Sequence, residues 1–272
     1  MSDTATTARA EAVAATLGEH ELDQLVVGDL VSPGDSGREA MAPVSWICGF
    51  RGSSGLVLVG GRERPAFITD FRYIEAAARV EAAGFEVVEA GRQLTEALAP
   101  ELRGRVGFDP GSTSVKVRDK LAEASGEDVE LVAVEGIVER LRRVKDAIEI
   151  EAIRAASELT DAVYAEIERD GLAGRSEREV ATWIESRMRE LGAEGPSFPP
   201  IVAAGPNGAL PHAVPGDREI GRGELVVCDL GAICDGYCSD GTRTYATGPV
   251  SERAREVHEL VGRALEAGCE AL

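Results

Sequence analysis

Short apolar runs alternate with stretches of helical periodicity along the first half of the chain. The apolar runs are rich in β-branched residues and predict strands at 23–27, 44–50, 55–59, 66–69, 85–89, 105–108 and 130–134. The stretches between and before them predict helices at 5–17, 73–83 and 115–124. Strands that alternate with helices in this way predict an α/β layer fold.

The pattern changes near residue 140, and we expect one domain at 1–140 and a second at 141–272. A long helix is predicted at the start of the second domain, because apolar residues recur at helical spacing at positions 148, 152, 153, 156, 159, 163 and 167. Ser176 and Glu179 have the spacing of a capping box, which predicts the first turn of another helix.

Strands near 198–204, a hairpin at 228–244 and a final helix from about Ser251 to the end of the chain complete the second domain. The hairpin is the most informative of these elements. Its two apolar runs are joined by Asp235 and Gly236, and an Asp-Gly pair between such runs is a strong signal for a two-residue turn.

Each strand of the hairpin carries one acidic residue, Asp229 and Asp240. With a two-residue turn, Asp229 faces Thr242 across the ladder and Gly231 faces Asp240. The two carboxylates then project from the same face as diagonal neighbours, with backbones roughly 7–8 Å apart. Two carboxylates aimed at one point repel, share a proton or bind cations.

Hard divalent cations with oxygen ligands would resolve this repulsion, and two such ions about 3.5–4 Å apart form a hydrolytic centre. The alternative is that both acids are turn and strand-end residues that face water, as aspartates near hairpins often do. Spacing alone leaves both interpretations open.

The segment SFPPIVAAGPNGALPHAVPGDREIGRGELVVCDLGA, residues 197–232, together with the hairpin resembles the pita-bread metallopeptidases, specifically Xaa-Pro dipeptidases (prolidases) and Xaa-Pro aminopeptidases. The resemblance implies that Asp229 and Asp240 are metal ligands. It also implies that His212, in the Pro-His-Ala motif, lies beside the metals and contacts the substrate. An aromatic residue at the place of Phe198 would line the substrate pocket.

Two N-terminal segments, ICGFRGSSGLVLV and FITDFRYIEAA, resemble the creatinase-type domain that precedes the catalytic domain in prolidases. The implied fold is an α/β creatinase-like domain followed by an α+β pita-bread domain, of which the first half and the start of the second are present. The family's other ligands, one His and two Glu, would lie beyond residue 272. We therefore expect this chain to be inactive as a fragment.

The resemblance further implies metal-assisted hydrolysis of Xaa-Pro bonds in short proline-containing peptides. The expected cofactors are two divalent ions, with Mn²⁺ as the first choice. Co²⁺ and Zn²⁺ stay open, because aspartate oxygens alone do not select among these metals. The full-length form is expected to be a homodimer. Two other functions stay open: a non-catalytic peptide-binding module, and a metal-independent creatinase-like amidinohydrolase. The pair of acids argues against both, because a site without metal has no use for two repelling carboxylates.

Composition and charge narrow the remaining choices. The net charge of −19 argues against nucleic acid or an anionic membrane surface as a partner. The polar N-terminus lacks the apolar core of a signal peptide, and no run approaches the ~18 apolar residues of a membrane span, so a cytoplasmic location is expected. Three of the five cysteines cluster at Cys228, Cys234 and Cys238, but their spacing is not that of a paired C-x-x-C zinc site.

Overall fold

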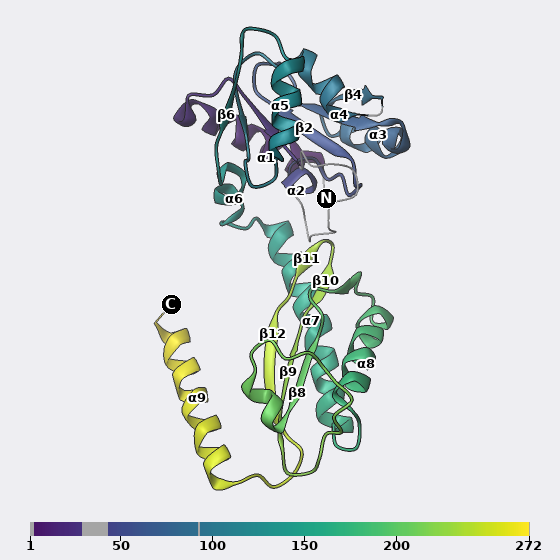
Figure 1. The fold of residues 1–272 in the computed structure, drawn as a ribbon, viewed down its shortest axis with the longest axis vertical. Helices are drawn as coiled ribbons and strands as arrows, with labels where there is room; N and C mark the ends of the chain where they lie inside the picture. The colour runs from purple at the N-terminus through teal and green to yellow at the C-terminus, as the bar shows by residue number, and fades with distance from the viewer. Residues whose placement is uncertain (1–2, 29–42, 92, 272) are drawn as a thin grey trace. The chain divides into compact units, whose positions relative to one another are not determined.

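The computed structural model describes residues 3–28, 43–91 and 93–271 (Figure 1). The chain divides into two compact units, Met1–Ile148 and Glu149–Leu272. Each unit has its own sheets and its own hydrophobic core.

The first unit is built on a six-stranded sheet with the strand order β4-β3-β2-β1-β5-β6. Strand β1 pairs parallel with β5 and antiparallel with β2, while β3 with β4 and β5 with β6 are parallel pairs. The strands are β1 (Gln24–Val27), β2 (Gly55–Val59), β3 (Ala66–Asp70), β4 (Glu86–Ala90), β5 (Gly104–Phe108) and β6 (Val129–Ala133). Six of the seven predicted strands are therefore present.

The helices of this unit are α1 (Asp3–Thr16), α2 (Pro43–Cys48), α3 (Ile74–Ala82), α4 (Leu94–Leu98), α5 (Val115–Ala124) and α6 (Ile137–Arg142), with short 3-10 turns at Leu17–His20, Phe71–Tyr73 and Ala99–Glu101. One core cluster packs side chains of the sheet against α4 and α5, namely Val26, Leu56, Leu58, Ile68, Leu98, Leu102, Val106 and Leu121. The three predicted helices are confirmed, whereas the short α4 and α6 were not predicted.

The predicted strand at 44–50 is wrong, because this segment forms α2. All residues from Val44 to Cys48 are buried. The segment therefore lacks the alternation that would distinguish a half-buried strand from a buried helix. Pro43 at the start supports the helix, since its fixed φ suits a first helical turn.

Asp70 at the end of β3 makes the stability of this unit depend on pH. Its buried carboxylate accepts hydrogen bonds from the Arg72 side chain at 2.8 Å and from the Ser54 hydroxyl at 2.6 Å. The Arg72 guanidinium, aided by Ser54, holds the pKa of Asp70 well below its usual range. Because the pKa is lowered in the folded state, the stabilisation is present above the unfolded pKa of about 3.9 and is lost as the pH falls below it.

We therefore expect Asp70→Asn to lower the free energy of unfolding of the first unit by about 2 kcal/mol at pH 7, the value of charged hydrogen bonds lost from a buried site. The difference from the unsubstituted chain should shrink towards pH 3. Urea unfolding followed by Trp46 fluorescence at both pH values measures this. An equal difference at pH 7 and pH 3 would contradict the assignment to Asp70.

The second unit places two helices against a three-stranded antiparallel sheet of order β12-β9-β8. Its elements are α7 (Ala147–Asp170), α8 (Glu177–Glu190), β7 (Gly195–Pro196), β8 (Ile201–Ala204), the 3-10 turn η4 (Gly205–Ala209), β9 (Leu225–Leu230), β10 (Ala232–Cys234), β11 (Tyr237–Cys238), β12 (Gly241–Ala246) and α9 (Glu252–Glu270). Strands β10 and β11 form the tip of the hairpin and, together with β7, make a second small sheet of order β11-β10-β7. Both predicted helices are confirmed, and Ser176 and Glu179 form the complete capping box.

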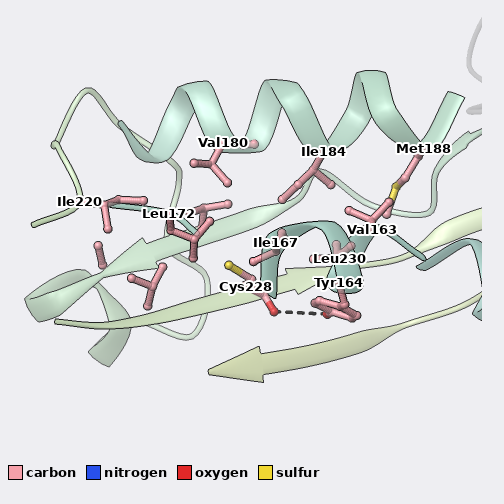
Figure 2. Packing of buried hydrophobic residues seen from close by; sticks show 14 of the residues in the cluster. Val163, Tyr164, Ile167, Leu172, Val180, Ile184, Met188, Ile220, Cys228 and Leu230 are labelled. Atoms are coloured by element: carbon pink, nitrogen blue, oxygen red, sulfur yellow. Dashed lines mark hydrogen bonds between the residues drawn. The ribbon is translucent and has the colours of Figure 1, made fainter. Parts of the chain in front are cut away.

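The core of this unit lies between the two helices and one face of the sheet (Figure 2). Alternate residues of β9, Val226, Cys228 and Leu230, face the helices. The single hydroxyl proton of Tyr164 in α7 is shared between the Cys228 carbonyl at 3.3 Å and the Gly241 carbonyl. Burial raises the pKa of the Cys228 thiol to about 12, which fits a packing role and not a metal-binding thiolate.

Ser251 caps the first turn of the final helix α9, because its hydroxyl accepts a hydrogen bond from the Ala254 amide. None of its described side chains is buried, and its apolar residues Val257, Leu260, Val261 and Leu265 are between 42% and 68% exposed. His258 and Glu259 are also exposed. Across the described residues, no helix is both long enough and apolar enough to cross a membrane.

Candidate metal centre

The hairpin register is the one that the sequence predicts. Asp235 and Gly236 form the turn with φ values of 50° and 77°, as a type I′ turn requires, and Cys234 pairs with Tyr237. Further down the ladder Asp229 pairs with Thr242, as expected from the two-residue turn.

Asp229 lies on the face of the sheet opposite to the core. Val226, Cys228 and Leu230 face the helices, so the alternation of the strand places Asp229 and Val227 on the other face. Thr242, directly across from Asp229, donates a hydrogen bond from its hydroxyl to Asp229 Oδ1 at 2.8 Å. This contact fixes the rotation of the carboxylate.

Asp240 is exposed and lies in a break between β11 and β12, not inside a strand. The preceding residue, Ser239, keeps the register through the break, because its amide donates to the Ala232 carbonyl at 2.9 Å. Asp240 therefore still lies opposite Gly231, with one residue, Gly241, between it and Thr242 on the strand that it precedes. The expectation that Asp240 starts the return strand needs only this small correction.

Ser239 anchors the break to α7. Its buried hydroxyl donates to the Ala156 carbonyl at 2.9 Å, accepts from the Ala232 amide at 3.0 Å and contacts the Thr160 hydroxyl at 2.7 Å. The residue next to Asp240 is thus held in the core while Asp240 itself faces outward. Sequence reasoning missed Ser239 and Thr160, since no local pattern links positions so far apart in the chain.

Only glycine fits at position 231 in this break, because neighbouring atoms leave no room for a side chain. A Cβ atom there would lie 2.0 Å from the Ser239 carbonyl oxygen and 2.2 Å from Ser197 Oγ. Ser197 itself is bonded to both strands, through its amide to the Gly231 carbonyl at 2.9 Å and through its hydroxyl to the Ser239 carbonyl at 2.8 Å.

Phe198 follows Ser197 directly, is half-buried and lies between β7 and β8, so the strand predicted from residue 198 begins only at Ile201. Its backbone is therefore attached to the same break in the hairpin as Asp240. Arg243 lies over the Tyr164 ring on the core side.

His212 is exposed and lies in the segment that follows η4, with Ala213 buried beside it. The turn η4 packs against β8 and β9, and a Cβ atom added at Gly208 would lie 3.6 Å from Val227 Cγ2, on the sheet face that also carries Asp229. The segment with His212 follows this turn directly in the chain. Within the residues described, no three side chains of His, Cys, Asp or Glu form a group that could hold a metal ion.

Two domain models match the chain, one for each part. Residues 9–144 match the creatinase/prolidase N-terminal domain, and residues 151–272 match metallopeptidase family M24. The solved Xaa-Pro dipeptidase from Bacillus anthracis is 31% identical, with a TM-score of 0.85 over 95% of this chain and 70% of that one. The chain belongs to the M24 metallopeptidases. The predicted fold class, a creatinase-type domain followed by part of a pita-bread domain, is confirmed.

Curated M24 relatives give the same result. The uncharacterized peptidase YqhT of Bacillus subtilis is 39% identical over 222 residues, 80% of this chain and 62% of that protein. The Xaa-Pro dipeptidase of Pyrococcus furiosus is 35% identical over 223 residues, 80% of this chain and 61% of that protein. The match thus spans about three-fifths of the length of these relatives.

Membership of a metallopeptidase family implies divalent metal ions. The residues of the hairpin fit such ions in kind, since Asp229 and Asp240 offer carboxylate oxygens on or beside the sheet face opposite the core. They do not suffice in number, because two carboxylates provide fewer ligands than one hard cation takes. A complete M24 centre would need ligands in addition to these two.

Proposed function

We propose that this chain carries the substrate-binding part and the first two metal ligands of a dinuclear-metal hydrolase that cleaves Xaa-Pro peptide bonds. The observation that supports this most strongly is the pairing of Asp229 with Thr242 on the sheet face opposite the core. The similarity to prolidases supports the choice of reaction.

In this proposal, Asp229 and Asp240 hold two divalent ions, with Mn²⁺ as the first choice. When bound, such ions activate water and stabilise negative charge on the carbonyl oxygen of the substrate. Thr242 keeps the Asp229 carboxylate in one orientation through the 2.8 Å hydrogen bond. The anchored Ser239 does the same for the backbone at Asp240.

His212 and Phe198 are assigned to the peptide. A neutral imidazole on the covering segment is able to donate a hydrogen bond to a substrate carbonyl or to move a proton. The half-buried Phe198 ring would pack against the proline ring, since its backbone is next to the anchored Ser197. Short proline-containing peptides are the proposed substrates, and the homodimer and cytoplasmic location stay predictions.

The assay of this function uses a chain extended to the length of its relatives, supplied with Mn²⁺ and an Xaa-Pro dipeptide. Release of proline that stops when a chelator is added supports the proposal. Peptide binding without hydrolysis would favour the non-catalytic module. Hydrolysis of an amidine substrate that resists the chelator would favour the metal-independent amidinohydrolase.

In the extended chain, we expect His212→Ala to lower kcat roughly a hundredfold and to leave the bound Mn²⁺ unchanged, because His212 is assigned to the substrate. Steady-state kinetics and metal analysis of the same preparation measure both quantities. His258→Ala on the exposed face of α9 is the matched control and should keep the original kcat. Unchanged turnover, or loss of the metal, in the His212→Ala chain would remove His212 from this role.

A further inference from the structure

Glu177 is a carboxylate buried in the first turn of α8, with an exposed fraction of 1%. Its Oε1 accepts hydrogen bonds from the Ala204 amide at 2.8 Å and from Asn207 Nδ2 at 2.9 Å. Its Oε2 is 3.1 Å from Asn207 Nδ2 and accepts from the Gly216 amide at 3.2 Å. Both oxygens are thus satisfied by N–H donors, as burial of a carboxylate requires.

These donors lie at the two ends of one segment of the chain. Ala204 is the last residue of β8, Asn207 lies in η4, and Gly216 closes the segment. His212 lies between them. Within the segment, turns are formed by the bond from the Leu210 amide to the Asn207 carbonyl at 2.9 Å and by the Ala213 amide at 3.2 Å from the Leu210 carbonyl.

The backbone of α8 holds the far end of the same segment. The Arg178 amide donates to the Gly216 carbonyl at 2.9 Å, and the Glu177 amide donates to the Arg218 carbonyl at 3.1 Å. These amides belong to the first turn of the helix. The N–H groups of a first turn have no carbonyl partners within the helix. The first turn of α8 therefore fixes Gly216 through both its backbone and the Glu177 side chain.

Helix capping does not account for Glu177. Ser176 and Glu179 already form a complete capping box at this end of α8, and Glu179 is exposed. Glu177 points the other way, towards η4 and the segment that carries His212. The turn η4 packs against β9, and a Cβ atom added at its Gly208 would lie 3.6 Å from Val227, which shares the sheet face of Asp229.

We propose that Glu177 is a positioning residue that sets the place of His212 above the Asp229 face of the sheet. The inference rests on the proposed function for the assignment of His212 to the substrate and for its place beside Asp229. Glu177 touches neither metal nor peptide in this role. It acts through Asn207 and Gly216, which keep the ends of the segment at a fixed distance from the sheet.

The first test measures the segment itself, in the 272-residue chain without metal or peptide. Glu177→Gln keeps the shape of the side chain but turns one acceptor oxygen into a donor that faces N–H groups. We expect the Ala204 and Gly216 amides to exchange hydrogen about tenfold faster or more, with core amides such as Cys228 unchanged. Glu179→Gln is the matched control in the same helical turn and should leave both amides as they were.

Asn207→Ala is the milder second variant, in case Glu177→Gln prevents folding. It removes the contact with η4 and keeps the bond to Gly216, so the η4 amides should exchange faster while Gly216 stays protected. Exchange rates that are unchanged in this variant and in Glu177→Gln would overturn the proposal.

The second test compares kinetics in the extended chain. Glu177→Gln should lower kcat with bound Mn²⁺ unchanged, and the double variant Glu177→Gln/His212→Ala should be no slower than His212→Ala alone, because both act through one group. Additive losses, or loss of metal, would show a merely structural role and overturn the proposal. If the unsubstituted extended chain cleaves no Xaa-Pro peptide, the proposed function fails, while hydrogen exchange still decides whether Glu177 holds the segment.

Discussion

A chain extended to the length of its prolidase relatives should bind Mn²⁺ tightly, and Asp229→Asn or Asp240→Asn should each weaken that binding at least about a hundredfold. Even residues that only orient a metal ligand contribute roughly 10–100-fold to affinity, so loss of a ligand should cost more. The 272-residue chain itself should bind Mn²⁺ weakly, because two carboxylates leave most coordination positions to water. Calorimetric titration of the chains with Mn²⁺ measures all of these affinities.

Asp235→Asn is the matched control for this titration. Asp235 lies in the same hairpin, but at the turn, and asparagine tolerates its positive φ of 50°. Its affinity for Mn²⁺ should equal that of the unsubstituted extended chain. Tight, stoichiometric binding that survives Asp240→Asn would show that the hairpin is not part of the metal centre.

Gly231→Ala should destabilise the second unit by about 3 kcal/mol, the upper range for overpacking a filled site. The added Cβ would lie 2.0 Å from the Ser239 carbonyl oxygen and 2.2 Å from Ser197 Oγ. Neither atom is able to move aside at low energetic cost, because Ser239 is hydrogen-bonded to α7 and Ser197 to the hairpin. Urea unfolding followed by Trp183 fluorescence, in a Trp46→Phe background, reports on this unit.

Gly241→Ala provides the comparison on the neighbouring strand. Its added Cβ would meet only Tyr164 atoms at 3.7 Å, an ordinary contact distance, so a change below about 1 kcal/mol is expected. If the two substitutions had equal effects, the close approach at Gly231 would not be what limits this position.

The sequence predicted best where the determining interactions are local. The Asp235-Gly236 turn fixes the register of its ladder, and the pairing of Asp229 with Thr242 follows from it. Ser176 and Glu179 are three positions apart and cap α8 as predicted. By contrast, the buried segment 44–50 has no alternation, and it forms the helix α2 in place of the predicted strand.

The parts of the candidate site that escaped prediction depend on contacts between distant positions. Ser239 meets Thr160 across 79 positions of the chain, and Glu177 reaches Gly216 across 39. Nothing in the neighbourhood of either serine or glutamate indicates its partner, since such pairs form only when the helices pack on the sheet. The anchoring of Asp240 through Ser239, and the contacts of Glu177 with the segment that carries His212, are therefore visible only in the folded chain.

The hairpin register also restricts which changes of length the protein is able to absorb. One residue inserted between Asp229 and the turn would reverse the facing of every position before it, unless a bulge takes up the extra residue. Asp229 would then enter the core side occupied by Cys228, and a hydrophobic neighbour would emerge in its place. Insertions and deletions in this part of the gene should thus be far more harmful than most substitutions.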